Sequence, residues 1–234
     1  ANVGEVVNQI KSLKPEVVFA PHVETSAGML LPDEYIQEVT QAVHSIGGIF
    51  VLDCVASGAL WVDMKKTGVD VLISAPQKGW SSSPCSGLVM LGATATKLIK
   101  ETKSSSYVCD LLKWYQIMEA YENGGHAYHS TMPTDSLAKF RDALIETETY
   151  GFEKTRQEQI DLGHEVRQLL ESKGFKSVAA EGFQAPSVVV SYTNDPDIKS
   201  GKVFIDGNDM DLTTRSSRLT ERYVDKRDLP NTYK

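Results

Sequence analysis

The chain has 234 residues, of which 41% are hydrophobic and 24% are charged, and its formal net charge is -7. These fractions are typical of a soluble globular protein with one large domain, or with a large domain and a smaller one. The acidic balance gives no positive field that would attract nucleic acid or an anionic membrane surface, so we expect neither as a partner.

The cysteines and the N-terminal residues further restrict the class of protein. Cys54, Cys85 and Cys109 form no CxxC pair and have no close histidine spacing, which argues against a disulfide framework and a zinc site. A reducing, cytoplasmic location is therefore expected. No apolar run reaches the roughly 18 residues that span a bilayer, and no signal peptide is visible. The opening ANVGEVV lacks an initiator methionine and is typical of the interior of a protein, so we expect a fragment or a processed product.

Apolar runs alternate with helical patterns along residues 1–150, which is typical of parallel βαβ units. One helical pattern places four apolar residues on a single face before two glycines end it, namely Ile36, Val39, Val43 and Ile46. In chain order, we expect helices at 3–14, 32–48 and 62–68, a buried strand at 16–23, further strands at 49–53, 69–76 and 86–92, and then helices at 93–103, 110–123 and 133–150.

The rhythm of the sequence changes near Gly151. A longer, more charged helix is expected over 151–174, followed by an apolar strand at 186–193. We therefore predict part of a large domain over 1–150 and a small C-terminal domain over 151–234. From about residue 200 apolar residues are sparse and neither period is sustained, so we expect this tail to be disordered or to pack only in an assembly.

Polar side chains follow three of the expected strands at their carboxyl ends, where open α/β sheets place ligand sites. Three loops at one sheet edge would then present an acid, an amine and several hydroxyl groups to one crevice. The side chains concerned are His22, Glu24, Thr25 and Ser26 after the first strand, Asp53 and Ser57 after the second, and Gln77 and Lys78 after the third.

This set of side chains predicts a Schiff-base site for pyridoxal 5'-phosphate (PLP). A lysine at the end of a buried strand is partly desolvated, which makes the Lys78 amine available as a nucleophile towards a carbonyl. A carboxylate such as Asp53 can pair with the pyridine nitrogen and keep it protonated. A lone strand-end lysine is more often a solvated or ion-paired surface group, so the prediction depends on Asp53 lying one βαβ unit earlier.

The runs HVETSAG, VLDCVAS and SAPQKGW occur in this order. With about the expected spacings, they resemble the HxESSTG, VDxVSS and SGSQKxL patterns of class V aminotransferases, most closely the alanine–glyoxylate and serine–pyruvate group. The later run AYHSTMP resembles the YHxTxP segment of that group. The similarity extends from about Val17 to about Tyr192.

The resemblance implies an α/β protein with the type I aminotransferase fold, which has a mainly parallel sheet with flanking helices and a small α/β C-terminal domain. It implies a PLP-dependent transfer of an amino group from a small amino acid, of the alanine or serine type, to a 2-oxo acid such as glyoxylate or pyruvate. A homodimer with shared active sites is also implied.

The resemblance also assigns roles to single residues. Lys78 matches the catalytic lysine that binds the cofactor, and Asp53 matches the carboxylate that faces the pyridine nitrogen. The other cofactor-binding positions are Thr25 at the ring, Gln77 at the phosphate, and Tyr128 and Thr131 at the phosphate of the neighbouring subunit's cofactor.

Two family features have no match here. The glycine-rich phosphate loop and the aromatic residue that stacks on the cofactor precede the position of Ala1, and no FRIG-like setting for the substrate-binding arginine is visible after Ser200. Two alternatives therefore stay open. One is the cysteine desulfurase or lyase branch, which usually has histidine where this chain has Gln77, and the other is a catalytically inactive, cofactor-free fragment.

Several polar residues near the expected site also have structural interpretations. His22 and His129 are interpreted as core histidines that satisfy backbone groups rather than as catalysts. Glu24 is interpreted as the cap of a loop. Cys54 and Cys85 are interpreted as small buried hydrophobic residues, because a free cysteine more often has that role than the role of a nucleophile.

Overall fold

The computed structural model describes residues 2–193, 202–205, 208–211, 213–214 and 217–218. It divides into two compact units, each built from separated stretches of the chain. Unit 1 comprises Ala1–Ala20, Glu34–Leu52 and Val62–Glu146, and unit 2 comprises Pro21–Asp33, Asp53–Trp61 and Thr147–Lys234. The domain boundary near Gly151 stays a prediction.

Most helices and strands lie close to their expected ranges, but the strand expected at 186–193 is found only at Val190–Ser191, and the strand at Met29–Leu30 is not among those expected. Those expected at 3–14, 49–53 and 151–174 are found at Val3–Leu13, Ile49–Asp53 and Phe152–Ser172. None of the helices in the described part of the chain is both long and apolar enough to cross a membrane. The helices are α1 (Val3–Leu13), α2 (Asp33–Ser45), α3 (Met64–Thr67), α4 (Ala93–Glu101), α5 (Leu111–Glu122), α6 (Thr134–Tyr150) and α7 (Phe152–Ser172), and the strands are β1 (Val17–Pro21), β2 (Val23–Glu24), β3 (Met29–Leu30), β4 (Ile49–Asp53), β5 (Val71–Ser74), β6 (Leu88–Leu91), β7 (Val190–Ser191), β8 (Lys202–Ile205), β9 (Asn208–Asp211), β10 (Thr213–Thr214) and β11 (Ser217–Arg218).

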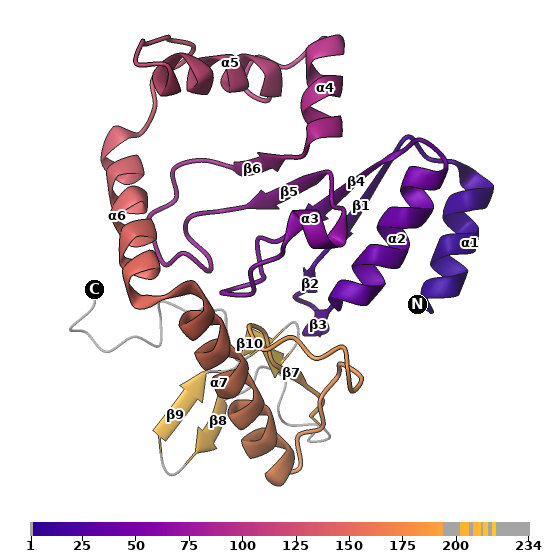
Figure 1. Ribbon diagram of the computed structural model, residues 1–234. Helices are drawn as coiled ribbons and strands as arrows, with labels where there is room; N and C mark the ends of the chain where they lie inside the picture. The colour runs from indigo at the N-terminus through magenta and orange to yellow at the C-terminus, as the bar shows by residue number, and fades with distance from the viewer. Residues whose placement is uncertain (1, 194–201, 206–207, 212, 215–216, 219–234) are drawn as a thin grey trace. The chain divides into compact units, whose positions relative to one another are not determined.

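A four-stranded sheet with the order β1-β4-β5-β6 forms the frame of the expected site. The sheet is mainly parallel, as expected. β6 instead pairs antiparallel with β5, from Val71 opposite Leu91 to Ser74 opposite Leu88, and the two arrows point in opposite directions in Figure 1. The chain returns from β5 to β6 without a helix, and such a direct return between neighbouring strands gives antiparallel pairing.

The first expected strand, at 16–23, is not a buried strand. The chain bends at His22, between β1 and β2, and β1 alternates exposed and half-buried residues. Phe19 is 71% exposed and points to the same face of β1 as Val17 and Pro21, which are also exposed. The apolar run therefore predicted a strand correctly but not its burial.

The buried core of unit 1 includes the apolar face of α2 and the apolar residues of β4. Ile36, Val43, Phe50 and Leu52 have no measurable exposure. Burying a large apolar side chain of this kind stabilises the fold by roughly 1.5–3 kcal/mol. The buried carboxylate of Asp70 closes this region, since its Oδ2 accepts the Phe50 N–H at 2.9 Å and lies 2.8 Å from Nε2 of His44.

The core of unit 2 is smaller. Val23, Ala185, Val188 and Val190 form a buried cluster, against which Leu30, Ala56 and Val178 pack. β2 and β3 pair antiparallel through Val23 opposite Leu30 and Glu24 opposite Met29. This arrangement places the residues after β2 and the turn after β4 in one unit.

The C-terminal tail differs from expectation in its described residues. β8 and β9 pair antiparallel, and β11 pairs with both β10 and β7. In the sequence, Asp206–Gly207 separates β8 from β9, and Asp-Gly is a dipeptide that favours hairpins. The expectation for the rest of the tail concerns residues outside the described part.

Candidate active site

The strand-end acid Asp53 begins a turn in unit 2. It is the last residue of β4 and is exposed, and its Oδ1 accepts the N–H of Val55 at 2.9 Å. A short acidic side chain that binds the backbone two residues on forms a recurrent turn. The second carboxylate oxygen has the chemistry to accept a hydrogen bond from a protonated ring nitrogen.

His22 contacts both ends of this turn. Its backbone N–H donates to the Asp53 carbonyl at 2.8 Å, and its ring Nδ1 lies 2.7 Å from Oγ of Ser57. His22 is 4% exposed and Ser57 is 2% exposed. His22 is buried, as interpreted, but its ring contacts the Ser57 hydroxyl rather than a backbone group. The prediction placed Ser57 at the sheet edge but gave it no role.

Burial also sets the protonation of this cluster. Desolvation lowers the pKa of His22 to about 4, while the charge of Asp33 acts in the opposite direction. Desolvation raises the pKa of Cys54 to about 12, against a lowering effect of its hydrogen bond with Ser57. At neutral pH His22 is therefore uncharged and Cys54 is a thiol, which fits the interpretation of Cys54 as a buried hydrophobic residue.

The remaining predicted residue of unit 2 is Thr25, which is half-buried in the loop between β2 and β3. Glu24 caps this loop, because its Oε1 accepts both the N–H and the hydroxyl of Ser26, at 2.8 and 2.7 Å. The interpretation of Glu24 as a cap is confirmed. The loop ends at Gly28, whose φ of +62° and close approach to the Val188 carbonyl exclude a side chain.

Lys78 lies in unit 1, in the tight turn that follows β5. Its N–H lies 3.5 Å from the Ala75 carbonyl, and its own carbonyl accepts the N–H of Ser81 at 3.0 Å. Lys78 and the neighbouring Gln77 are exposed. The expectation that Lys78 is partly desolvated is therefore wrong for this structure, because the buried part of the segment ends at Pro76.

The segment after Lys78 is held in an unusual shape. Ser81 has a φ of +54°, which is uncommon for a residue with a side chain. Trp80 packs edge-on against Phe140 of α6 with ring centroids 6.0 Å apart, in agreement with its interpretation as a packing residue. The hydroxyl of Ser82 is buried without a hydrogen-bond partner among the described residues. Such strain is common where a loop presents a functional side chain.

The two residues expected at the neighbouring subunit's phosphate lie together in unit 1. Both Tyr128 and Thr131 are exposed, and their hydroxyl oxygens are 3.0 Å apart. Between them in sequence, the His129 ring packs tilted against Tyr107 and edge-on against Trp114, at centroid distances of 4.2 and 5.0 Å. These contacts agree with a structural role for His129.

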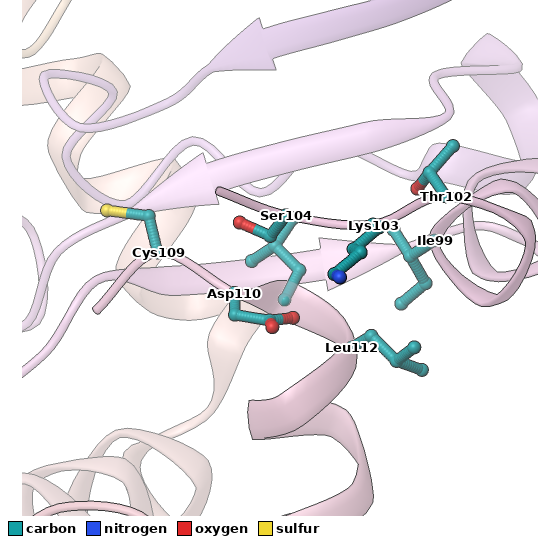
Figure 2. Close-up of a pocket in the computed structure, with 8 residues that line it drawn as sticks. Ile99, Thr102, Lys103, Ser104, Cys109, Asp110 and Leu112 are labelled. Carbon is teal, nitrogen blue, oxygen red and sulfur yellow. The ribbon is translucent and has the colours of Figure 1, made fainter. Parts of the chain in front are cut away.

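A separate pocket lies between the end of α4 and the start of α5. It has a volume of about 160 Å³. Figure 2 shows its lining, which includes Ile99, Lys103, Cys109 and Asp110. None of the predicted cofactor-binding residues lines this pocket, so it is distinct from the predicted site.

The predicted site residues are thus divided between the two units. Unit 2 holds Asp53 and Thr25, and unit 1 holds the amine, amide and phenol groups. The structure brings together Tyr128 and Thr131, and it places Gln77 beside Lys78 on one turn. Chemically, this inventory offers a nucleophilic amine, a carboxylate and several neutral hydrogen-bonding groups.

Comparison with known proteins identifies the family. Residues 3–201 match the family described as Aminotransferase class-V. The chain belongs to this family. The resemblance seen in the three motifs is therefore confirmed.

Curated proteins with similar sequences show which activities occur among the relatives of this chain. The chain is 30% identical over 154 residues to the alanine–glyoxylate aminotransferase of Callithrix jacchus, an alignment that covers 64% of this chain and 36% of that protein. It is 29% identical over 172 residues to the 2-aminoethylphosphonate–pyruvate transaminase of Syntrophobacter fumaroxidans, covering 71% and 44%. The chain thus spans less than half the length of these relatives.

Solved structures of aminotransferases confirm the fold. The alanine–glyoxylate aminotransferase of Nostoc sp. superposes with a TM-score of 0.76 at 20% identity, covering 84% of this chain and 51% of that one. The pyridoxamine–pyruvate aminotransferase of Mesorhizobium loti gives a TM-score of 0.71 at 17% identity, covering 84% and 50%. The chain therefore has the type I fold of PLP-dependent aminotransferases.

Proposed function

We propose that this chain works in a PLP-dependent aminotransferase that moves an amino group from a small amino acid to a 2-oxo acid such as glyoxylate or pyruvate. One observation carries the proposal: in a class-V chain, Asp53 ends β4, and Lys78 follows the neighbouring strand β5. Ligand sites of open α/β sheets lie beyond the carboxyl ends of adjacent strands.

The donor groups present fit the cofactor. The aldehyde requires an amine, which Lys78 supplies from an exposed turn. The pyridine nitrogen requires a carboxylate, and Asp53 is exposed with one oxygen held by Val55. The ring and phosphate require neutral hydrogen-bonding side chains, for which we propose Thr25, Gln77, Tyr128 and Thr131.

Each of this chain's residues would have a limited task. When bound, PLP supplies an electron sink for the electrons released at the substrate α-carbon. The Lys78 amine would hold the cofactor and, once displaced by substrate, remove the proton from the α-carbon. A positioned base of this kind accelerates proton transfer by roughly 10²–10⁴. The Asp53 carboxylate would keep a proton on the ring nitrogen.

The amino donor has two candidates. A small amino acid such as alanine is supported by similarity to alanine–glyoxylate aminotransferase, and 2-aminoethylphosphonate by similarity to the 2-aminoethylphosphonate–pyruvate transaminases. We expect pyruvate or glyoxylate as the acceptor in both cases. Transfer from each donor to each acceptor, measured side by side, distinguishes the candidates.

Replacement of the proposed catalytic lysine tests the function. The unaltered chain should gain the near-visible absorbance of a lysine-bound PLP, and borohydride should fix the cofactor on the peptide that contains Lys78. Lys78→Ala should lose this absorbance and all turnover. Lys97→Ala, which removes an exposed lysine 3.9 Å from Glu101, should change neither. Full activity in Lys78→Ala would overturn the proposal.

Two rival functions have their own signatures. A cysteine desulfurase from Thermococcus onnurineus shares the fold at a TM-score of 0.59, and this branch would release sulfide from cysteine. The residue before Lys78 is Gln77 rather than histidine, which favours the aminotransferase. A purified chain that stays colourless with added PLP would instead support the inactive fragment.

We also propose a homodimer with shared active sites in the cytoplasm. Tyr128 and Thr131 support it, because both are exposed and hydrogen-bonded to each other, so that together they can reach a phosphate on a second subunit. The location is supported by the reduced state of Cys54, Cys85 and Cys109, which are all free.

A further inference from the structure

His22 clamps the turn that begins at Asp53. Its backbone N–H holds the first residue of the turn, through the Asp53 carbonyl at 2.8 Å. Its ring holds the last, through Nδ1 and the Ser57 hydroxyl at 2.7 Å. His22 therefore contacts both ends of the turn, which is also closed by the bond from the Ser57 N–H to the Cys54 carbonyl at 3.2 Å.

The clamp is buried, which makes its hydrogen bond costly to lose. His22 is 4% exposed to solvent and Ser57 is 2% exposed. Loss of one partner leaves the other as an unsatisfied polar group in a buried region.

The shape of the turn held by His22 sets the direction of the Asp53 carboxylate. Asp53 is exposed, and its one described side-chain contact is the bond from Val55 N–H to Oδ1, at 2.9 Å. Val55 lies between the two clamped residues. A change in the shape of the turn would therefore move Val55 and release the carboxylate to rotate.

We propose that His22 and Ser57 are positioning residues that orient the Asp53 carboxylate towards the ring nitrogen of PLP. This inference rests on the proposed function, because the orientation matters only if Asp53 serves that nitrogen. His22 touches neither substrate nor cofactor in this assignment, and it acts through the turn.

The test uses the full chain and a matched set of variants. Ser57→Ala and His22→Leu remove the clamp, and His22→Asn keeps a hydrogen-bonding atom at the place of Nδ1. Ser187→Ala is the control, because its Oγ donates to the Ala56 carbonyl of the same turn at 2.9 Å but contacts neither clamped residue. Amide hydrogen exchange at Val55 is read without cofactor, and the ¹⁵N signal of the ring nitrogen is read with ¹⁵N-labelled PLP.

We expect Val55 exchange to accelerate roughly tenfold in Ser57→Ala and His22→Leu, with the Val178 amide of the same unit unchanged. The ring-nitrogen signal should move towards its unprotonated value in both, while borohydride still fixes PLP on Lys78. His22→Asn should restore both readouts, and Ser187→Ala should leave Val55 exchange within about twofold of the unaltered chain.

Other results would overturn one proposal without the other. Equal Val55 exchange and equal ring-nitrogen signals in Ser57→Ala and Ser187→Ala would refute the clamp while leaving the aminotransferase proposal intact. Failure of borohydride to label the unaltered chain would refute the proposed function. Val55 exchange would then decide by itself whether His22 and Ser57 hold Asp53.

Discussion

The protonation of His22 makes a specific link between one side chain and the pH dependence of folding. Burial lowers the folded-state pKa of His22 to about 4, against an ordinary value of 6.5. Between pH 4 and pH 6.5, His22 therefore binds a proton in the unfolded chain but not in the folded chain. The free energy of unfolding is therefore not reduced by His22 above pH 6.5. As the pH falls from 6.5 towards 4, protonation of His22 in the unfolded chain lowers it by about 3 kcal/mol in total.

His22→Asn removes the titrating group and should flatten this dependence. The free energy of unfolding in urea, measured from pH 7 to pH 4, should fall less steeply for the variant than for the unaltered chain. His126→Asn serves as the control, because His126 is exposed, and should leave the slope unchanged. Parallel pH profiles for His22→Asn and the unaltered chain would contradict the assignment.

Also at the scale of single residues, the exposure of Lys78 shows that partial desolvation does not explain its expected reactivity. The apolar run before Lys78 predicted partial desolvation of the amine, but burial ends at Pro76 and the turn carries Gln77 and Lys78 outwards. Sequence located the lysine at a strand end because the apolar run is local. Its exposure depends on which elements surround the turn, and the apolar run contains no information on that.

At the scale of elements, α7 depends on one glycine. Gly163 lies buried in the middle of the helix, and a Cβ added there would lie 2.3 Å from the Pro186 carbonyl oxygen. Glycine in a helix interior costs about 1 kcal/mol relative to alanine, so the close contact explains why it fits here. The segment that carries Pro186 leads into the buried valines of the unit 2 core.

Gly163→Ala should therefore destabilise the chain although it favours the helix itself. Overpacking against backbone typically costs 1–3 kcal/mol, so we expect a net loss of about 1–2 kcal/mol, measured by urea denaturation followed by circular dichroism. Leu162→Ala, at a neighbouring position that is 60% exposed, should have a much smaller effect. A Gly163→Ala variant more stable than the unaltered chain would show that the contact relaxes freely.

At the scale of the whole molecule, exposed apolar side chains concentrate in one stretch of unit 1. Monomeric soluble proteins rarely leave large apolar surfaces uncovered. These side chains are therefore the part of the described chain from which we expect subunit contacts. They are Tyr107 (64% exposed), Val108 (71%), Met118 (64%), Tyr121 (60%) and Tyr128 (74%).

We expect light scattering to give twice the chain mass of 25.8 kDa for the unaltered protein. Val108→Asp and Met118→Glu should shift the mass towards the monomer, because each places a charge among these side chains. Leu13→Glu, on an exposed site of α1, should not. A monomer at all concentrations, or a dimer insensitive to both substitutions, would contradict the proposed interface.

The sequence by itself determined the local elements and the inventory of chemical groups. β4 lies at Ile49–Asp53 as expected, because its apolar run begins directly after two glycines and ends at a charged residue. The three motifs also identified the family, since they are short, ordered and specific. Local pattern suffices for these properties because each depends on neighbouring residues.

The tertiary structure alone decided how these groups are held. The His22–Ser57 bond joins residues 35 apart in sequence, and the bond from Ala59 to Gln159 joins residues 100 apart. The division into two units likewise draws on separated stretches of chain. No local period encodes such pairings, because they arise only when distant segments pack together and leave each buried polar group with a partner.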